Sequence, residues 1–197
     1  MPPPKKAPKK AAKKTIKKVA KKVAKHHPAH DQGSDLRRAY EHMSRVEILQ
    51  SCHAPLKLSD AKAVTALATM ARQQLQTGSN KEAANLLRGS EHLSFAALAD
   101  EGSDKIQLSD ELVQSITEQF DELSEKADKH WEEHEEGPAV LTAVYEKLRK
   151  SAAKALKHGA YYQALELARA AEALAHVRWD GPHKLEDGKK PRKLTAV

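Results

Sequence analysis

The sequence predicts an all-α protein, a bundle of roughly six helices. Alanine and leucine are abundant, aromatic residues make up only 4% of the chain, and no segment alternates apolar and polar residues over the length of a strand. Glycine or proline ends several of the segments in which apolar residues recur every three or four positions. We therefore expect helices joined by short turns and no sheet.

The first helix is expected to begin near Ser34, where a 3.6-residue apolar stripe starts. Pro55 should end it, because proline does not fit a helix interior. A second helix should be capped by Ser59 and Asp60 and stop at Gly78, and a third should span about 80–99. The stripe of the first helix comprises Leu36, Tyr40, Met43, Val46 and Leu49.

The second half follows a polar link at 100–107. Ser109 is the expected N-cap of a long fourth helix. The Gly137-Pro138 pair should stop that helix and start a fifth, which ends near Gly159. The sixth helix should run over about 160–178.

An internal repeat organises these helices. Shifting the chain by 81 positions aligns apolar residues, the turn glycines, and an arginine and a glutamate that packing alone does not require to match. Since that arginine and glutamate lie three positions apart on one helix face, they can pair. We therefore predict one domain at 34–182, built from two similar three-helix units at about 34–102 and 108–182. The aligned pairs include Leu67 with Leu148, Gly78 with Gly159, Arg88 with Arg169, and Glu91 with Glu172.

Charge separates the chain into an arm and a body. The first thirty residues contain eleven lysines and no acid, whereas the chain from residue 31 onward has 23 basic and 27 acidic residues. Such a block of like charge repels itself, so we predict a disordered basic tail at 1–33. A second, flexible basic segment is predicted at 183–197.

The lysines of the arm suggest a polyanionic partner, of which nucleic acid is the commonest. No aromatic residue lies among them, so we expect phosphate contacts without base stacking or sequence preference. An anionic membrane surface and a solvated tail with no specific partner remain alternatives. The predicted nucleic-acid-binding residues are Lys5, Lys6, Lys9, Lys10, Lys13, Lys14, Lys17, Lys18, Lys21, Lys22 and Lys25.

The Pro-Lys-Lys-Ala and Ala-Lys-Lys units of residues 2–25 resemble the tails of linker histone H1 and of bacterial histone-like proteins. This resemblance implies that the arm coats or condenses DNA. It also implies a protein associated with the nucleoid or with chromatin.

The segment KHGAYYQALELARAAEALA resembles two helical families. It is similar to the turn and second helix of a tetratricopeptide-type hairpin. It is also similar to the HEPN family of helical bundles, whose ribonucleases carry an arginine followed after four to six residues by a histidine. That resemblance implies a ribonuclease or toxin-type RNA-binding protein with Arg169 and His176 as catalytic residues. Ala170 departs from the polar residue that usually follows the arginine.

A few other residues could carry chemistry. His130 and His134 lie four apart in the string HWEEH, a spacing that can hold one zinc ion, but six acidic residues crowd positions 125–136 and we expect a solvated helix end. Glu91 and Glu172 could face each other as paired carboxylates, although pairing with Arg88 and Arg169 is the better prediction. No metal site and no cofactor are predicted.

The single cysteine, Cys52, excludes an internal disulfide, and no apolar run reaches the length of a membrane span. We therefore expect an intracellular, cytoplasmic protein.

Its expected role is that of a non-enzymatic, nucleic-acid-associated interaction protein, whose arm binds phosphate and whose helical body contacts a protein partner or forms a homodimer.

Overall fold

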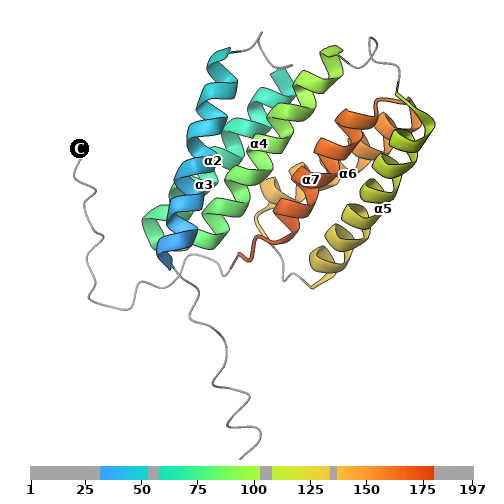
Figure 1. Ribbon diagram of the computed structural model, residues 1–197. Coiled ribbons are helices and arrows are strands. Elements are labelled where there is room, and N and C mark those ends of the chain that lie inside the picture. The colour runs from blue at the N-terminus through green and yellow to red at the C-terminus, as the bar shows by residue number, and fades with distance from the viewer. Residues whose placement is uncertain (1–31, 53–57, 103–107, 134–136, 180–197) are drawn as a thin grey trace, which may run out of the picture. The chain divides into compact units, whose positions relative to one another are not determined.

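The computed structural model describes residues 32–52, 58–102, 108–133 and 137–179, and these form six α-helices without a strand (Figure 1). The predicted fold class is confirmed. Within the described residues no helix is both long and apolar enough to cross a membrane. The helices are α2 (Gln32–Cys52), α3 (Leu58–Thr77), α4 (Asn80–Gly102), α5 (Asp110–Glu132), α6 (Ala139–Lys157) and α7 (Tyr161–Ala175).

The predicted tails lie almost wholly outside the described residues. Of the arm predicted at 1–33, only Gln32 and Gly33 are described, and both belong to α2. The segment predicted at 183–197 lies outside, as do residues 180–182 at the end of the predicted domain. The structure therefore describes the body of the protein.

Most predicted helix ends agree with the structure, but α3 begins at Leu58, so Ser59 and Asp60, the predicted cap residues, lie inside its first turn. Ser109 caps α5, since its side chain accepts a hydrogen bond from the Leu112 amide at 3.4 Å. The sixth helix is shorter than predicted, because α7 ends at Ala175 rather than near residue 178. Its last turn tightens into bonds such as the one from the Val177 amide to the Leu174 carbonyl (3.0 Å), and the chain then buries Val177.

The two short turns of the bundle are built identically. Gly78 and Gly159 both have positive φ angles, 86° and 77°, which a residue with a side chain rarely adopts. After each glycine, the next amide donates to the carbonyl five positions earlier, at 2.9 Å in both turns. This is the Schellman motif that closes a helix C-terminus. The turns therefore repeat at the predicted interval of 81 residues.

Burial repeats at the same interval. Every buried residue between positions 83 and 96 of α4 has a buried counterpart between positions 164 and 177. The same shift relates the buried residues of the outer helices, since Asp35, Ala39 and Val46 of α2 correspond to Ile116, Phe120 and Ala127 of α5. The two predicted three-helix units are thus also two equivalent packing units.

Helices α4 and α7 form the centre of the bundle. Helix α4 packs against α2 and α3, α7 packs against α5 and α6, and α4 and α7 pack against each other. Across the view of Figure 1, α2, α4, α7 and α5 follow one another, while α3 and α6 lie behind them. Exchanging the two units leaves this contact pattern unchanged, so the units are related by an approximate twofold axis.

Small residues lie where α4 and α7 cross. Gly89 and Ser90 of α4 and Ala170 and Ala171 of α7 are small residues, and all four are buried. A Cβ atom on Gly89 would lie 2.7 Å from Cδ2 of Leu174 and 3.5 Å from the Ala170 carbonyl oxygen. Small side chains at this crossing therefore let the two helices approach closely.

Candidate functional site

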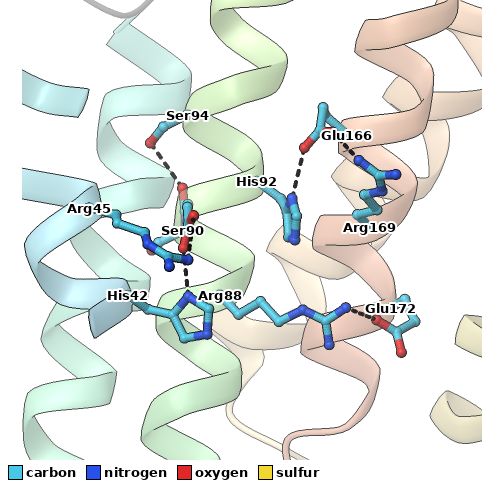
Figure 2. A network of polar contacts seen from close by, with 10 residues as sticks. His42, Arg45, Arg88, Ser90, His92, Ser94, Glu166, Arg169 and Glu172 are labelled. Carbon is cyan, nitrogen blue, oxygen red and sulfur yellow. Dashed lines mark hydrogen bonds and ion pairs between the residues drawn. The ribbon is translucent and has the colours of Figure 1, made fainter. Parts of the chain in front are cut away.

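Three glutamates along α4 and α7 gather the histidines and arginines of the body into clusters between helices (Figure 2). The clusters are named here by their carboxylates, Glu91, Glu166 and Glu172. Each carboxylate contacts both a histidine and an arginine. Together they span the contacts of α2 with α4 and of α4 with α7.

The Glu91 cluster joins α2 to α4. His42 Nδ1 lies 2.6 Å from Glu91 Oε2, and Arg45 Nη1 lies 3.4 Å from Oε1. Burial opposes ionisation of Glu91, but the hydrogen bond from His42 and the positive charges of His42 and Arg45 outweigh it, so the pKa of Glu91 lies below its ordinary value. Because an ionised carboxylate only accepts, His42 donates through Nδ1.

The Glu166 cluster joins the two units. His92 of α4 contacts Glu166 of α7 across the unit boundary, with 2.7 Å between Nδ1 and Oε2. Arg169, one turn further along α7, donates to the other carboxylate oxygen at 2.6 Å. Burial again raises the pKa of Glu166, yet His92 and Arg169 bring it below its ordinary value.

The Glu172 cluster also crosses the unit boundary. Arg88 Nη2 lies 3.1 Å from Glu172 Oε2, an ion pair without hydrogen-bond alignment, and His176 Nε2 lies 2.9 Å from Oε1. The ring of His130 from α5 lies 4.2 Å from that of His176, between centroids. Burial lowers the pKa of His176, and the nearby charges of His130 and Arg88 add to this, while Glu172 opposes it.

The less favoured alternative, in which Glu91 and Glu172 face each other as paired carboxylates, is not what the structure shows, because each contacts a histidine and an arginine. Arg88 pairs with Glu172 of the other unit, Arg169 pairs with Glu166, and Glu91 takes its partners from α2. The matched arginine and glutamate, three positions apart in each unit, were expected to pair along one helix. Glu172 does pair with Arg88, one of the arginines predicted for it, but across the unit boundary, whereas Arg169 pairs with Glu166 three positions earlier on its own helix.

Arg169 of α7 and His176, the C-cap residue of that helix, belong to the HEPN-like interpretation but are seven residues apart, about 10 Å along the axis at the helical rise per residue. Each contacts its own carboxylate, Glu166 for the arginine and Glu172 for the histidine. Arg169 and His176 therefore belong to two different clusters and lie two helical turns apart.

The two candidate metal ligands differ in what the structure says of them. His130 lies at the end of α5, 3.8 Å from Glu133 and against His176. His134 lies outside the described residues. Among the residues that are described, no group of three or more His, Cys, Asp or Glu could hold a metal ion. The eleven lysines of the arm also lie outside the described residues.

In enzymes, a histidine paired with a carboxylate can act as the general base that activates a hydroxyl nucleophile. Hydroxyl groups near the three clusters are therefore candidate nucleophiles. Ser90 and Ser94 lie on α4 within one helical turn of Glu91 and are labelled in Figure 2. Both are buried, and their hydroxyls donate to backbone carbonyls, of Val64 at 3.3 Å and of Ser90 at 2.9 Å. These serines therefore complete the helix packing rather than face a substrate.

Sequence reasoning missed His42, His92 and Glu166 as members of the clusters. His42 and Glu91 are 49 positions apart and His92 and Glu166 are 74 apart, so no local spacing connects them. The one available signal was the spacing of Glu166 and Arg169, three residues apart on a helix, which favours pairing.

The lowered pKa values of His176, Glu91 and Glu166 predict that the protein loses stability in acid. Because the folded state binds protons less readily at His176, stability should be full above the unfolded value of 6.5 and fall as the pH decreases below it. Glu91 and Glu166 should add a further loss as the pH falls below 4.5 and through their lower folded pKa values. Urea unfolding measured at a series of pH values should show both losses of stability. The loss below pH 6.5 should be smaller in the variant His176→Gln. An unfolding midpoint that rises as the pH decreases would contradict this prediction.

Comparison of the chain with known protein families, with curated proteins and with solved structures gives no significant match to any of them.

Proposed function

We propose that this is a nucleic-acid-associated interaction protein, in which lysines 5–25 bind the phosphate backbone without sequence preference and the helical body makes protein contacts. The observation that carries the proposal is the charge division. Eleven lysines and no acid precede residue 31, and the remainder has 23 basic and 27 acidic residues. Each lysine that contacts a phosphate displaces condensed counterions, which drives binding to any sequence. Such an arm would direct the protein to the nucleoid or to chromatin.

The charge of the body supports this division of labour. Helix α5 carries eight acidic residues and two lysines, and all eight acids are exposed. Such a surface repels a polyanion. Within the bundle, the arginines of the three clusters contact carboxylates of the protein itself. The body is therefore a poor phosphate-binding surface, and the arm is the better one.

The alternative is a HEPN-like ribonuclease that uses Arg169 and His176. Both side chains are partly exposed, as such a site would need. The hydrogen bonds of Arg169 with Glu166 and of His176 with Glu172 favour a structural role for both residues instead. RNA cleavage that disappears in the variant His176→Ala would support the ribonuclease and contradict a non-enzymatic role.

The proposal is tested by removing the charge of the arm while keeping its length. A variant with all eleven arm lysines replaced by glutamine should bind an unrelated duplex DNA and an unrelated RNA about 100-fold more weakly at low salt, measured by fluorescence anisotropy. A control variant should replace exposed lysines of the body, Lys62, Lys129, Lys150, Lys154 and Lys157, and should bind like the wild type. Equal losses in the two variants would show that the arm is not the binding element.

A further inference from the structure

The end of α5 meets the end of α7 through two histidine rings. Helix α5 lies beside α7 and packs along it (Figure 1). The ring of His130, in the last turn of α5, lies 4.2 Å from that of His176, the C-cap residue of α7, with 47° between the ring planes. Both side chains are partly exposed, 37% for His130 and 33% for His176. The two elements thus meet through side chains that can each take up a proton.

The first unit shows that the fold does not require histidines here. Moved back by 81 positions, His130 falls on Leu49 of α2, and His176 falls on Phe95 of α4. The outer helices α2 and α5 bury equivalent residues against the central helices α4 and α7. Apolar residues therefore occupy in the first unit the positions that histidines occupy in the second. Apolar side chains suffice for packing, whereas the two histidines add a response to pH.

The carboxylate that contacts His176 is shared with an arginine. His176 Nε2 lies 2.9 Å from Oε1 of Glu172, and Arg88 Nη2 of α4 lies 3.1 Å from Oε2. Burial lowers the pKa of His176; Glu172 opposes this effect, while the charges of His130 and Arg88 add to it. A proton on His176 is thus only partly compensated, because Glu172 also balances Arg88.

The charged groups of α5 around His130 compensate a proton there only weakly. Glu133, three positions along the chain, lies 3.8 Å from His130 Nδ1 and is 53% exposed, so water screens its charge. Lys126, one turn earlier on α5, pairs with Glu122 and also interacts electrostatically with Glu172. Once both rings are protonated, positive groups therefore outnumber the carboxylates at this contact.

The end of α5 also contacts α6, through side chains other than histidine. Trp131 stacks on Tyr145, with 3.8 Å between the ring centroids and 7° between the planes. The Tyr145 hydroxyl donates to Asp128 at 3.2 Å, and Arg149 pairs with the same carboxylate. Because histidine is the side chain whose ordinary pKa lies between about pH 5 and 8, the contact with α7 is the one that responds in this range. Trp131 directly follows His130 and so reports on this end of the helix.

We propose that His130 and His176 form a pH-sensitive latch, which holds the end of α5 on α7 at neutral pH and releases it in mild acid. With both rings protonated, two positive charges face each other at 4.2 Å beside Arg88. In the released end each ring is surrounded by water and binds its proton more readily, so a fall in pH favours release.

The latch controls the exposure of an apolar surface. Ala127, one turn before His130, is fully buried when the end of α5 lies on α7. Release would expose it in acid, whereas neutral pH keeps it covered. The latch goes beyond the proposed function and does not depend on nucleic-acid binding by the arm.

The latch is tested in the full-length chain by the fluorescence of Trp131. The chain has two tryptophans, so the variant Trp179→Phe leaves Trp131 as the single one and serves as the reference protein. As the pH falls from about 8 to about 5, the emission maximum should move to longer wavelength and quenching by acrylamide should increase. The midpoint should lie below 6.5, the ordinary pKa of histidine, because burial lowers the pKa of His176. Far-ultraviolet circular dichroism should keep its helical signal throughout.

Variants of the reference protein assign the shift to the two rings. His130→Gln and His176→Gln should each remove most of the shift, because a single charged ring has no second one to repel. Transplanting the residues of the first unit, as His130→Leu with His176→Phe, should keep the emission constant down to about pH 5. The matched control His158→Gln, at the exposed histidine that caps α6, should titrate like the reference protein.

Three results would overturn the latch. The first is a reference protein whose Trp131 emission stays constant down to about pH 5. The second is an emission shift that occurs only together with the loss of helical circular dichroism, since the whole body then unfolds at once. The third is a shift that survives His130→Gln or His176→Gln undiminished, and it does not require the transplanted variant to fold.

Discussion

Replacing Gly89 by valine is expected to lower the free energy of unfolding by about 3 kcal/mol, because the crossing of α4 and α7 has no room for a branched side chain. Even the first added carbon would lie 2.7 Å from Leu174 Cδ2 and 3.5 Å from the carbonyl oxygen of Ala170. Leu174 is fully buried and cannot move aside without displacing its neighbours. The measurement is urea unfolding followed by circular dichroism.

Two further variants isolate the cause of this loss. Ala143→Val, at an exposed position of α6, should cost only about 0.5 kcal/mol through helix propensity. The variant Leu174→Ala lacks the side chain that a Cβ atom on Gly89 would contact. In this variant, Gly89→Val should lower the free energy of unfolding clearly less than it does in the wild type. If Gly89→Val costs no more than Ala143→Val, the helices do not approach each other as closely as the structure shows.

Separating the two units is expected to abolish the folded monomer altogether. A piece with residues 32–102 and a piece with residues 108–179 would each expose the face of its central helix that the other unit buries. Each would also be near the lower size limit for a domain with one core. Separately they should show weak helical circular dichroism, and on mixing they should regain it as a one-to-one complex, measured by light scattering.

The approximate twofold axis adds a sharper expectation for the first piece. At high concentration it can replace α7 by α4 of a second copy, which would set Arg88 against Glu91 in the way that Arg88 now meets Glu172. Gly89→Val in this piece should block both this self-association and the complex with the second piece. A piece with residues 32–102 that folds as a stable monomer would contradict the central role of the contact between α4 and α7.

The sequence was sufficient to predict the helices and their repeat. Helix periodicity and punctuation are local properties, so Ser109, Gly78 and Gly159 could be assigned as helix ends from the residues around them. The interval of 81 residues also follows from residue identity alone. It correctly anticipated that the turns and the buried faces of the two units are equivalent.

The clusters could not be predicted, because their members come together only through packing. Arg88 and Glu91 seemed suited to each other by helical spacing, yet which carboxylate an arginine reaches depends on which helix lies beside it. The antiparallel crossing of α4 and α7 brings Glu172 to Arg88 and Glu166 to His92. The angle and register of that crossing follow from small buried residues, Gly89 and Ala170 among them, which composition alone does not distinguish from other small residues.

The proposed nucleic-acid function of the arm is tested most directly by the salt dependence of binding. Full-length protein and a protein that starts at Ser34 should be titrated with unrelated duplex DNA and RNA over a range of salt concentrations. For the full-length protein, the logarithm of the association constant should fall with the logarithm of salt by about 0.9 per phosphate contact on duplex DNA, and the shortened protein should lose binding. Undiminished binding by the shortened protein, or a flat salt dependence, would contradict the assignment of phosphate binding to the arm.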